Sequence, residues 1–275
     1  MQEEYSVSVV IPTRNRFSAV WGAIKSVIDQ GQYIRQIIIV DDDSTDLTSD
    51  SYELLKSFDP RVEIYRSPYR IGGAAARNLG AERATGEFIA FLDDDDIWLE
   101  GKIAKQLIFL RKHRSCGAVL CSELCLSMQT GDVSWTNPRR VNRRRLIAHF
   151  PCPGTSCLMV RSTVFKLVGG FNPSLRRLQD WDLYLRLSAI TELGLIREPL
   201  TLWSSHRGEQ ISKLDHALYS SYVKIFFKMK ACLTAPELAY FRLLLLRHRR
   251  GGDIGFVQLL YLKIKMRFYK TICGW

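Results

Sequence analysis

Two runs of aspartate follow apolar stretches of this chain. Residues 91–98 are FLDDDDIW, with four consecutive carboxylates from Asp93 to Asp96, and residues 41–43 are a second run, DDD. Like charges repel, and an acidic cluster beside an apolar core is costly unless a cation neutralises it. Carboxylate oxygens suit Mg²⁺ or Mn²⁺, and Mg²⁺ sites often combine one or two carboxylates with substrate phosphates. The sequence therefore predicts a divalent cation and a phosphorylated substrate such as a nucleotide.

Buried strands are predicted ahead of both runs. Uninterrupted apolar stretches rich in β-branched residues are typical of strands covered on both faces. Such stretches lie at 7–11, 37–40, 62–65, 88–92 and 117–121. Apolar residues at helical spacing lie between them, at 17–30, 73–84 and 100–111. This alternation predicts an α/β fold with a mostly parallel central sheet and helices on both faces.

The predicted sheet places the two acidic runs together. In such sheets, ligands bind beyond the carboxyl ends of the strands. Residues 41–43 follow one predicted strand and Asp93–Asp96 follow another, so we expect both runs over one crevice. A structural alternative exists for each run, since an Asp after a strand often caps the next helix or forms a turn.

The second half of the chain has a looser pattern. Residues 137–145 (NPRRVNRRR) predict an Arg-rich loop, and short helices are predicted at 162–167 and 182–189. The last part, 213–275, is predicted to be a basic, amphipathic helical tail.

Charge is concentrated in that tail. The formal net charge is +11, and residues 213–275 hold twelve Lys and Arg against three Asp and Glu. Such asymmetry indicates an anionic partner. No nucleic-acid recognition motif is present, so docking on an anionic membrane face is favoured over nucleic acid. Ordinary helices that cover the core are the alternative.

The termini and cysteines bear on location. The first residues, MQEEYSVSVVIP, lack the features of a signal peptide, and no stretch of 18 uncharged apolar residues predicts a spanning helix. The seven cysteines lack zinc-ligand spacing. We therefore expect buried, reduced thiols in a cytoplasmic protein that is peripheral on the inner face of the plasma membrane.

Four segments in order carry a family resemblance. They are IPTRNR (11–16), IIIVDDDSTD (37–46), GGAAARNLGAERATGEFIAFLDDDDIW (72–98) and GGFNPSLRRLQDWDLYLRL (169–187). With this spacing, the chain over roughly residues 6–212 resembles the inverting family 2 glycosyltransferases of the GT-A fold. The resemblance implies metal-dependent transfer of a sugar from a UDP-sugar to a hydroxyl of a saccharide acceptor. With the tail charge, it also implies a lipid-linked acceptor in cell-surface polysaccharide or O-antigen synthesis.

The resemblance assigns residues to the nucleotide-sugar. Asp42 would contact the base, and Arg77 would lie near the nucleotide. The loop beside the base would contribute Pro12, Asn15, and Arg14 or Arg16.

The acidic run Asp93–Asp95 matches the D-x-D signature of the family. Asp95 would ligate Mn²⁺ or Mg²⁺, while Asp93 and Asp94 would serve the sugar-nucleotide and the metal shell. His206 is a further candidate for the metal, and Asp96 is expected to be structural.

Asp180 matches the catalytic base of the family, which removes the proton of the attacking hydroxyl. Two alternatives stay open: Asp180 could cap the following helix, and Asp182 could be the base. The family's Glu before this Asp is Gln179 here, and the usual Gly of the turn after the second strand is Asp43. Thr155 and Ser156 are weak candidates for the acceptor side.

The resemblance also divides the chain. A glycosyltransferase domain would span 1–212, with a nucleotide-binding half at 1–122 and an acceptor-binding half at 123–212. Two other functions remain open. A sugar-nucleotide nucleotidyltransferase would need a Gly-rich N-terminal loop with a Lys, which IPTRNR lacks. A non-catalytic, membrane-associated sugar-nucleotide-binding protein is the other.

Overall fold

The computed structural model describes residues 7–46, 48–136, 141–143, 146, 152–205 and 216–229, with single residues at 234, 237, 238 and 242. The candidate His206 and most of the basic tail lie outside these residues. Helix α8 (His216–Met229) is the main described part of the tail, and it confirms a helix there. None of the described helices is long and apolar enough to cross a membrane.

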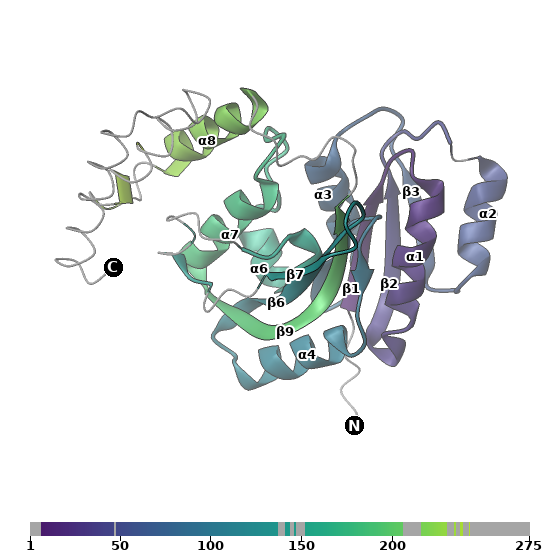
Figure 1. Ribbon diagram of the computed structural model, residues 1–275, viewed down its shortest axis with the longest axis horizontal. Helices are drawn as coiled ribbons and strands as arrows, with labels where there is room; N and C mark the ends of the chain where they lie inside the picture. The colour runs from purple at the N-terminus through teal and green to yellow at the C-terminus, as the bar shows by residue number, and fades with distance from the viewer. Residues whose placement is uncertain are drawn as a thin grey trace.

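One sheet organises the described residues (Figure 1). Its strands are β1 (Val7–Thr13), β2 (Ile34–Asp41), β3 (Val62–Arg66), β4 (Phe88–Phe91), β5 (Ile97–Trp98), β6 (Cys116–Ser127), β7 (Val133–Thr136), β8 (Met159–Arg161) and β9 (Glu192–Ser205). They are ordered β3-β2-β1-β4-β8-β6-β9-β5, and β7 pairs with β6. The five predicted strands correspond to β1, β2, β3, β4 and the buried part of β6.

The sheet changes character at β8. Strands β3, β2, β1 and β4 are parallel to one another, as predicted. Strand β8 is antiparallel to both β4 and β6, and β6 and β9 are parallel to each other. The sheet is therefore parallel in its N-terminal half and mixed beyond it.

Helices cover both faces of the sheet, which confirms that prediction. They are α1 (Phe17–Ile28), α2 (Ser49–Ser57), α3 (Gly73–Arg83), α4 (Lys102–Lys112), α6 (Ser162–Leu167) and α7 (Gln179–Ile190), with short 3₁₀ turns η1 (Gly31–Tyr33) and η2 (Thr155–Cys157). Side chains alternate across β1, because successive residues of a strand face opposite sides. Val9 joins the core under α1 and α4, whereas Val10 joins the core under α3, α6 and α7.

One close approach fixes α3 against the sheet. Gly80 faces Val10 and Val40, and a Cβ atom at this position would clash with the Val10 side chain. Helix α3 carries Arg77 on the turn before Gly80, so this contact determines how close Arg77 lies to the ends of the strands.

The described cysteines are all free thiols. Cys116, Cys121 and Cys157 are buried as expected, whereas Cys125 and Cys152 are only half-buried. Cys232 and Cys273 lie outside the described residues.

Candidate active site

The carboxyl ends of β1, β2 and β4 meet at one edge, as the alternation of strands and helices predicts. The Asp42 amide donates to the Thr13 carbonyl (2.9 Å), and the Leu92 amide donates to the Val10 carbonyl (3.0 Å). The Thr13 hydroxyl donates to Asp94 Oδ2 at 2.7 Å. The two acidic runs therefore lie over the same edge of the sheet.

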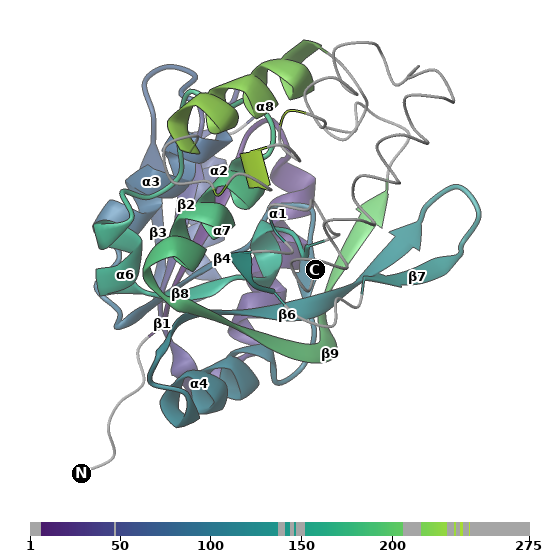
Figure 2. The same cartoon turned by 90° about the vertical axis from the view of Figure 1, so that its left-hand side faces the viewer.

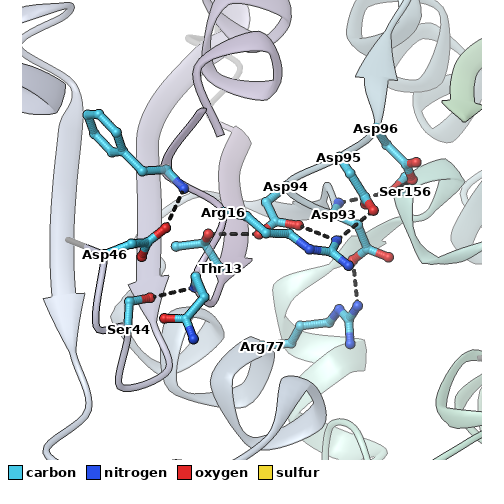
Figure 3. A network of polar contacts seen from close by, with 12 residues as sticks. Thr13, Arg16, Ser44, Asp46, Arg77, Asp93, Asp94, Asp95, Asp96 and Ser156 are labelled. Atoms are coloured by element: carbon cyan, nitrogen blue, oxygen red, sulfur yellow. Dashed lines mark hydrogen bonds and ion pairs between the residues drawn. The ribbon is translucent and has the colours of Figure 1, made fainter. Parts of the chain in front are cut away.

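The four aspartates of 93–96 have different partners. Asp93 Oδ1 accepts from Arg77 Nη2 at 2.5 Å, and Arg16 Nη1 lies 3.1 Å from Asp94 Oδ1 and 2.5 Å from Asp95 Oδ2. Two guanidinium groups therefore offset part of the charge of the four carboxylates, one from the β1–α1 loop and one from α3 (Figure 3).

Burial separates Asp94 from its neighbours. The side chain of Asp94 is 8% exposed, against 30% for Asp95 and 34% for Asp93. Burial raises the pKa of Asp94 to about 6, although the Thr13 hydroxyl and Arg16 act in the opposite direction. The two more exposed carboxylates are the ones that an incoming ligand can reach.

Ser156 holds the backbone of the acidic run. Its buried hydroxyl accepts from the Asp93 amide at 3.0 Å and donates to Asp96 Oδ2 at 2.5 Å. The Ser156 carbonyl accepts from Trp98 Nε1 at 2.8 Å. This geometry gives Asp96 the structural role expected for it, and it gives Ser156 a role in support of the acidic run.

Asp42 fastens a neighbouring loop. Its buried carboxylate accepts from the Ile71 amide (2.5 Å) and the Gly72 amide (2.9 Å), just ahead of α3. Its role as a contact to a nucleotide base stays a prediction.

The two loops beside Asp42 are joined to each other. The Asn15 amide donates to the Ser44 hydroxyl (2.9 Å), and Asn15 Oδ1 accepts from the Thr45 amide (2.8 Å). Asp46 Oδ2 accepts from the Phe17 amide at the start of α1 (3.1 Å). The candidates Pro12 and Arg14 lie on the same side of Asn15, at the end of β1 and just after it. Pro12 is in register with Val40 of β2. Within the described residues, the buried Nε of Arg14 has no hydrogen-bond partner.

Backbone strain marks this edge. Three non-glycine residues of the described chain have positive φ: Asn15 (52°), Asp43 (61°) and Leu178 (60°). Asn and Asp tolerate this region, as expected for Asp43, whereas Leu rarely adopts it. Strained backbone of this kind clusters at functional sites. Leu178 directly precedes α7, so its conformation sets the direction in which that helix begins.

Helix α7 brings Asp180 to the acidic run. Arg77 Nη1 donates to Gln179 Oε1 at 3.0 Å, while its Nη2 holds Asp93. Burial raises the pKa of Asp180, and the Trp181 amide (2.7 Å from Oδ1) and Arg77 partly offset this increase. A raised pKa suits a general base that works near neutral pH. Leu178, not Asp180, is the N-cap residue of α7.

The glycine-rich segment before α7 is anchored to α3. Asn78 exchanges two hydrogen bonds with the Phe171 backbone, each 2.8 Å long. A Cβ on Gly170 would lie 2.6 Å from Asn78 Oδ1, so only glycine fits there. The Arg77 guanidinium lies 5.5 Å from the centre of the Phe171 ring.

Comparison with known proteins identifies the family. The model of the family described as glycosyl transferase family 2 matches residues 8–167, which is more than half of the chain. This chain belongs to glycosyl transferase family 2.

Two bacterial glycosyltransferases match part of this family 2 chain in sequence. TuaG of Bacillus subtilis (strain 168), a candidate teichuronic acid biosynthesis glycosyltransferase, is 41% identical over 110 residues, which cover 40% of this chain and 43% of TuaG. WfgD of Escherichia coli, the UDP-Glc:alpha-D-GlcNAc-diphosphoundecaprenol beta-1,3-glucosyltransferase, is 35% identical over 111 residues, 40% of this chain and 43% of WfgD. The chain thus spans less than half of each relative.

Solved structures confirm the predicted GT-A fold of this family 2 chain. TarS 1-349 of S. aureus in complex with UDP-GlcNAc has a TM-score of 0.71 and 17% identity, covering 92% of this chain and 77% of that one. GalNAc-T7 with UDP, GalNAc and Mn²⁺ has a TM-score of 0.67 and 17% identity, covering 82% and 48%.

The alternative base Asp182 is not supported in this family 2 chain. Asp182 is fully buried, and its Oδ2 lies 2.8 Å from Arg186 Nε and 2.6 Å from Arg186 Nη2. Arg186 also donates to the carbonyls of Val168 and Gly170. Asp182 therefore fixes the glycine-rich segment from inside the protein, and no acceptor hydroxyl can reach it.

The carboxylates of the family 2 site fit a divalent cation that the substrate completes. In the part of the chain that the structure describes, no group of three or more His, Cys, Asp or Glu side chains is placed to hold a metal ion. Asp93 and Asp95 nevertheless carry hard oxygen ligands on side chains that are about a third exposed. Two carboxylates with substrate phosphates are the usual Mg²⁺ arrangement.

Two supporting residues, Thr13 and Asn78, were not predicted from the sequence, and Ser156 was predicted only as a weak candidate for the acceptor side. Thr13 and Asn78 lie inside the family 2 motifs, where a polar residue at a strand end or helix face was a usable signal. Ser156 lies 60 or more residues from its partners Asp93 and Asp96, and no local pattern connects them.

Proposed function

We propose that this chain is a metal-dependent, inverting glycosyltransferase that moves a sugar from a UDP-sugar to a hydroxyl of a lipid-linked saccharide in cell-surface polysaccharide synthesis. One observation carries this proposal. Arg77 pairs with Asp93 of the acidic run, contacts Gln179 and acts electrostatically on Asp180. The Arg77 guanidinium thus interacts with both a candidate donor-side carboxylate, Asp93, and the candidate base, Asp180.

Asp180 is the general base of the proposed reaction. Its pKa is raised by burial, so it takes the proton of the acceptor hydroxyl as that oxygen attacks the sugar carbon. Attack from the face opposite the leaving diphosphate inverts the configuration at that carbon, and no second nucleophile is needed.

Asp93 and Asp95 would hold Mn²⁺ or Mg²⁺ together with the donor diphosphate. The bound cation supplies charge that stabilises the departing diphosphate. The buried contact of Asp94 with Thr13 orients the run. Arg16 leaves its pairing with Asp95 as the donor binds. That exchange is open to Arg16, because its side chain is 52% exposed.

The nucleotide occupies the joined loops beside Asp42. Pro12, Arg14 and Asn15 flank the base from one side, and the loop that Asp42 fastens lies on the other. The TarS structure in complex with UDP-GlcNAc, which has the same fold, supports a UDP-sugar as donor. Residues 1–122 would form the nucleotide-binding half and 123–212 the acceptor-binding half.

The acceptor is proposed from the relatives and from charge. WfgD acts on a diphosphoundecaprenol-linked GlcNAc, as its name states. The tail from 213 to 275 carries twelve Lys and Arg, which suit an anionic bilayer. The protein would thus be cytoplasmic and peripheral on the inner face of the plasma membrane.

Transfer assays test the function. The purified chain is incubated with UDP-glucose, UDP-GlcNAc or UDP-galactose, Mn²⁺ or EDTA, and a diphospholipid-linked GlcNAc acceptor. We expect metal-dependent product with one donor, and a β-linkage by NMR. Donor hydrolysis without transfer would leave the acceptor open, and binding without either reaction would identify a non-catalytic sugar-nucleotide-binding protein.

A further inference from the structure

An apolar face on the hairpin of β6 and β7 is left exposed by the rest of the described structure. Leu124 pairs with Trp135, and Leu126 pairs with Val133. Directly opposed residues of antiparallel strands share a face, as do residues two apart on one strand. These four side chains therefore form one apolar face, and Met128 lies in the turn beside them.

This face is exposed along the edge of the sheet. Val133 is 62% exposed, Met128 57% and Trp135 50%. Figure 2 shows the hairpin extending beyond the helices that cover the rest of the sheet. A long apolar edge strand invites unwanted pairing unless something covers it. The opposite face carries Cys125 and Ser134, so the hairpin is amphipathic.

We propose that this hairpin face docks on an anionic lipid bilayer and inserts Met128, Val133 and Trp135 into its interface. The inference deepens the proposed function, since it rests on an acceptor held in that bilayer. Trp is favoured at the membrane–water boundary, where its ring lies at the level of the headgroups.

The positive charge that follows the hairpin in the sequence favours an anionic bilayer as the partner of this face. Residues 137–145 follow β7 directly and contain five arginines. Arg139 and Arg140 follow Thr136 by three and four residues in the sequence. Arg143 lies 3.9 Å from Glu237, and the other four arginines bring a formal charge of +4 to the sequence that follows the hairpin. Each cation near an anionic surface favours binding.

The same charge argues against a second copy of this chain. Each copy would carry the same Arg-rich sequence within a formal net charge of +11, and like charges repel. A bilayer with anionic headgroups attracts both the cations and the apolar face.

Strand β6 connects the docking face to the candidate site. Glu123, at the point where the hairpin begins, accepts from the Gly154 amide at 3.0 Å, and Gly154 precedes the turn that carries Ser156. Five residues separate Glu123 from Met128, a span of about 17 Å along an extended strand. One continuous strand thus joins the docking face to the candidate site, so docking would fix how far the site lies from the bilayer surface.

Vesicle flotation with the full chain tests the proposal. The probes are vesicles of phosphatidylcholine alone and of phosphatidylcholine with phosphatidylglycerol. Val133→Thr with Trp135→Thr removes apolar surface but keeps residues that favour strands. Ser134→Thr, on the opposite face, is the matched control. We expect the double variant to lose roughly tenfold or more of its partitioning onto the anionic vesicles, and the control to bind as the wild type does.

A second measurement needs no variant. Amide hydrogen exchange of the wild type should slow in residues 124–136 when the anionic vesicles are added. Unchanged exchange there, or unchanged partitioning of the double variant, would overturn the inference. A wild-type dimer that the double variant dissociates would overturn it too, by identifying a second copy as the occupant.

The outcome is separable from that of the proposed function. The double variant should transfer sugar to a water-soluble, short-chain acceptor at the wild-type rate. If neither protein transfers any sugar while vesicle binding still depends on the hairpin, the docking surface stands and the proposed function fails.

Discussion

Arg77 Nη1 donates a hydrogen bond to Gln179 Oε1 at 3.0 Å, and this bond ties α3 to the first residue of α7. The resemblance leads one to expect a glutamate at position 179. With glutamine, Arg77 keeps its full charge for Asp93 and for the carboxylate that follows, Asp180.

Gln179→Glu tests how this neutral residue tunes the base. A new carboxylate competes for Arg77 and adds a like charge beside Asp180, so the pKa of Asp180 rises further. A base with a higher pKa stays protonated up to a higher pH. We therefore expect the acidic limb of the pH–rate profile of transfer to move up by about one pH unit. Gln179→Leu adds no charge and serves as the control; equal limbs in the wild type and Gln179→Glu would contradict this account.

Asp180→Asn removes the proposed base without changing its shape. Loss of a positioned general base lowers the transfer rate by on the order of 10²- to 10⁴-fold. Donor affinity, measured by calorimetry, should stay within a factor of two or so, because the proposed donor contacts lie on other elements. Asp182→Asn breaks a buried ion pair instead, so it should lower the melting temperature. Near-normal turnover of Asp180→Asn would remove the assignment.

Asp95→Asn and Asp96→Asn test the proposed metal ligand against its neighbour, which is bonded to Ser156. We expect Asp95→Asn to weaken Mn²⁺-dependent donor binding roughly tenfold or more, the loss that about 1.4 kcal/mol of binding free energy produces. Asp96→Asn should keep that dependence, since Asp96 is bonded to Ser156. Thermal shift with UDP-sugar, with and without Mn²⁺, reads out both. The reverse ranking would exchange the two roles.

Ser156→Ala tests the support beneath the acidic run. The change leaves the Asp93 amide and the Asp96 carboxylate without their shared partner, which costs about 1–3 kcal/mol in the free energy of unfolding. Ser122→Ala is the matched control, because the Ser122 hydroxyl is also buried but has no partner within the described structure. Denaturant titration measures both variants. Ser156→Ala should also raise the Mn²⁺ concentration needed for half-maximal transfer, and equal behaviour of the two variants would contradict the support role.

The buried Lys102 should make the free energy of unfolding depend on pH. This fully buried ammonium donates to Gln106 Oε1 at 2.8 Å and lies 4.0 Å from the centre of the Trp98 ring. Burial lowers its pKa to about 8 from the ordinary 10.5. The unfolded chain therefore binds more protons between pH 8 and 10.5, so Lys102 makes stability rise with pH across that window.

Lys102→Met removes this contribution. Below pH 8, the free energy of unfolding of the variant should exceed that of the wild type by up to about 3 kcal/mol. The loss of the polar contacts of Lys102 reduces this gain. Its stability should also lack the rise between pH 8 and 10.5. Urea titrations of both proteins at pH 7, 9 and 10 measure the difference, and parallel pH dependences would show that Lys102 is charged and satisfied throughout.

Local patterns predicted the elements that carry most of the candidate site. The β-branched runs gave β1, β2 and β4, and the rule that parallel strands end at one edge placed Asp42 and Asp93 together. These features depend only on residue type and spacing, which each short segment contains.

The second half of the sheet depended on contacts that no short segment contains. The apolar pattern of strand β9 is interrupted by Arg197, Glu198 and Pro199. The register of β9 with β6 also shifts near Ser122. Such a stretch lacks the apolar run of a buried strand, so its pattern did not predict one. The support of the acidic run by Ser156 likewise arises only when η2 packs against β4.

The antiparallel pairing of β4 with β8 joins the two halves through three residue pairs, Phe88 with Arg161, Ile89 with Val160, and Ala90 with Met159. So short a seam makes the chain suited to recombination. A chimaera that took residues 7–112 from this protein and the rest from a relative would have to match these three pairs and the two pairs of β5 with β9, Ile97 with Leu202 and Trp98 with Thr201. The proposed acceptor-binding half could then be exchanged while the proposed donor loops stay intact, and conservation of these five pairs would be the criterion for choosing the second parent.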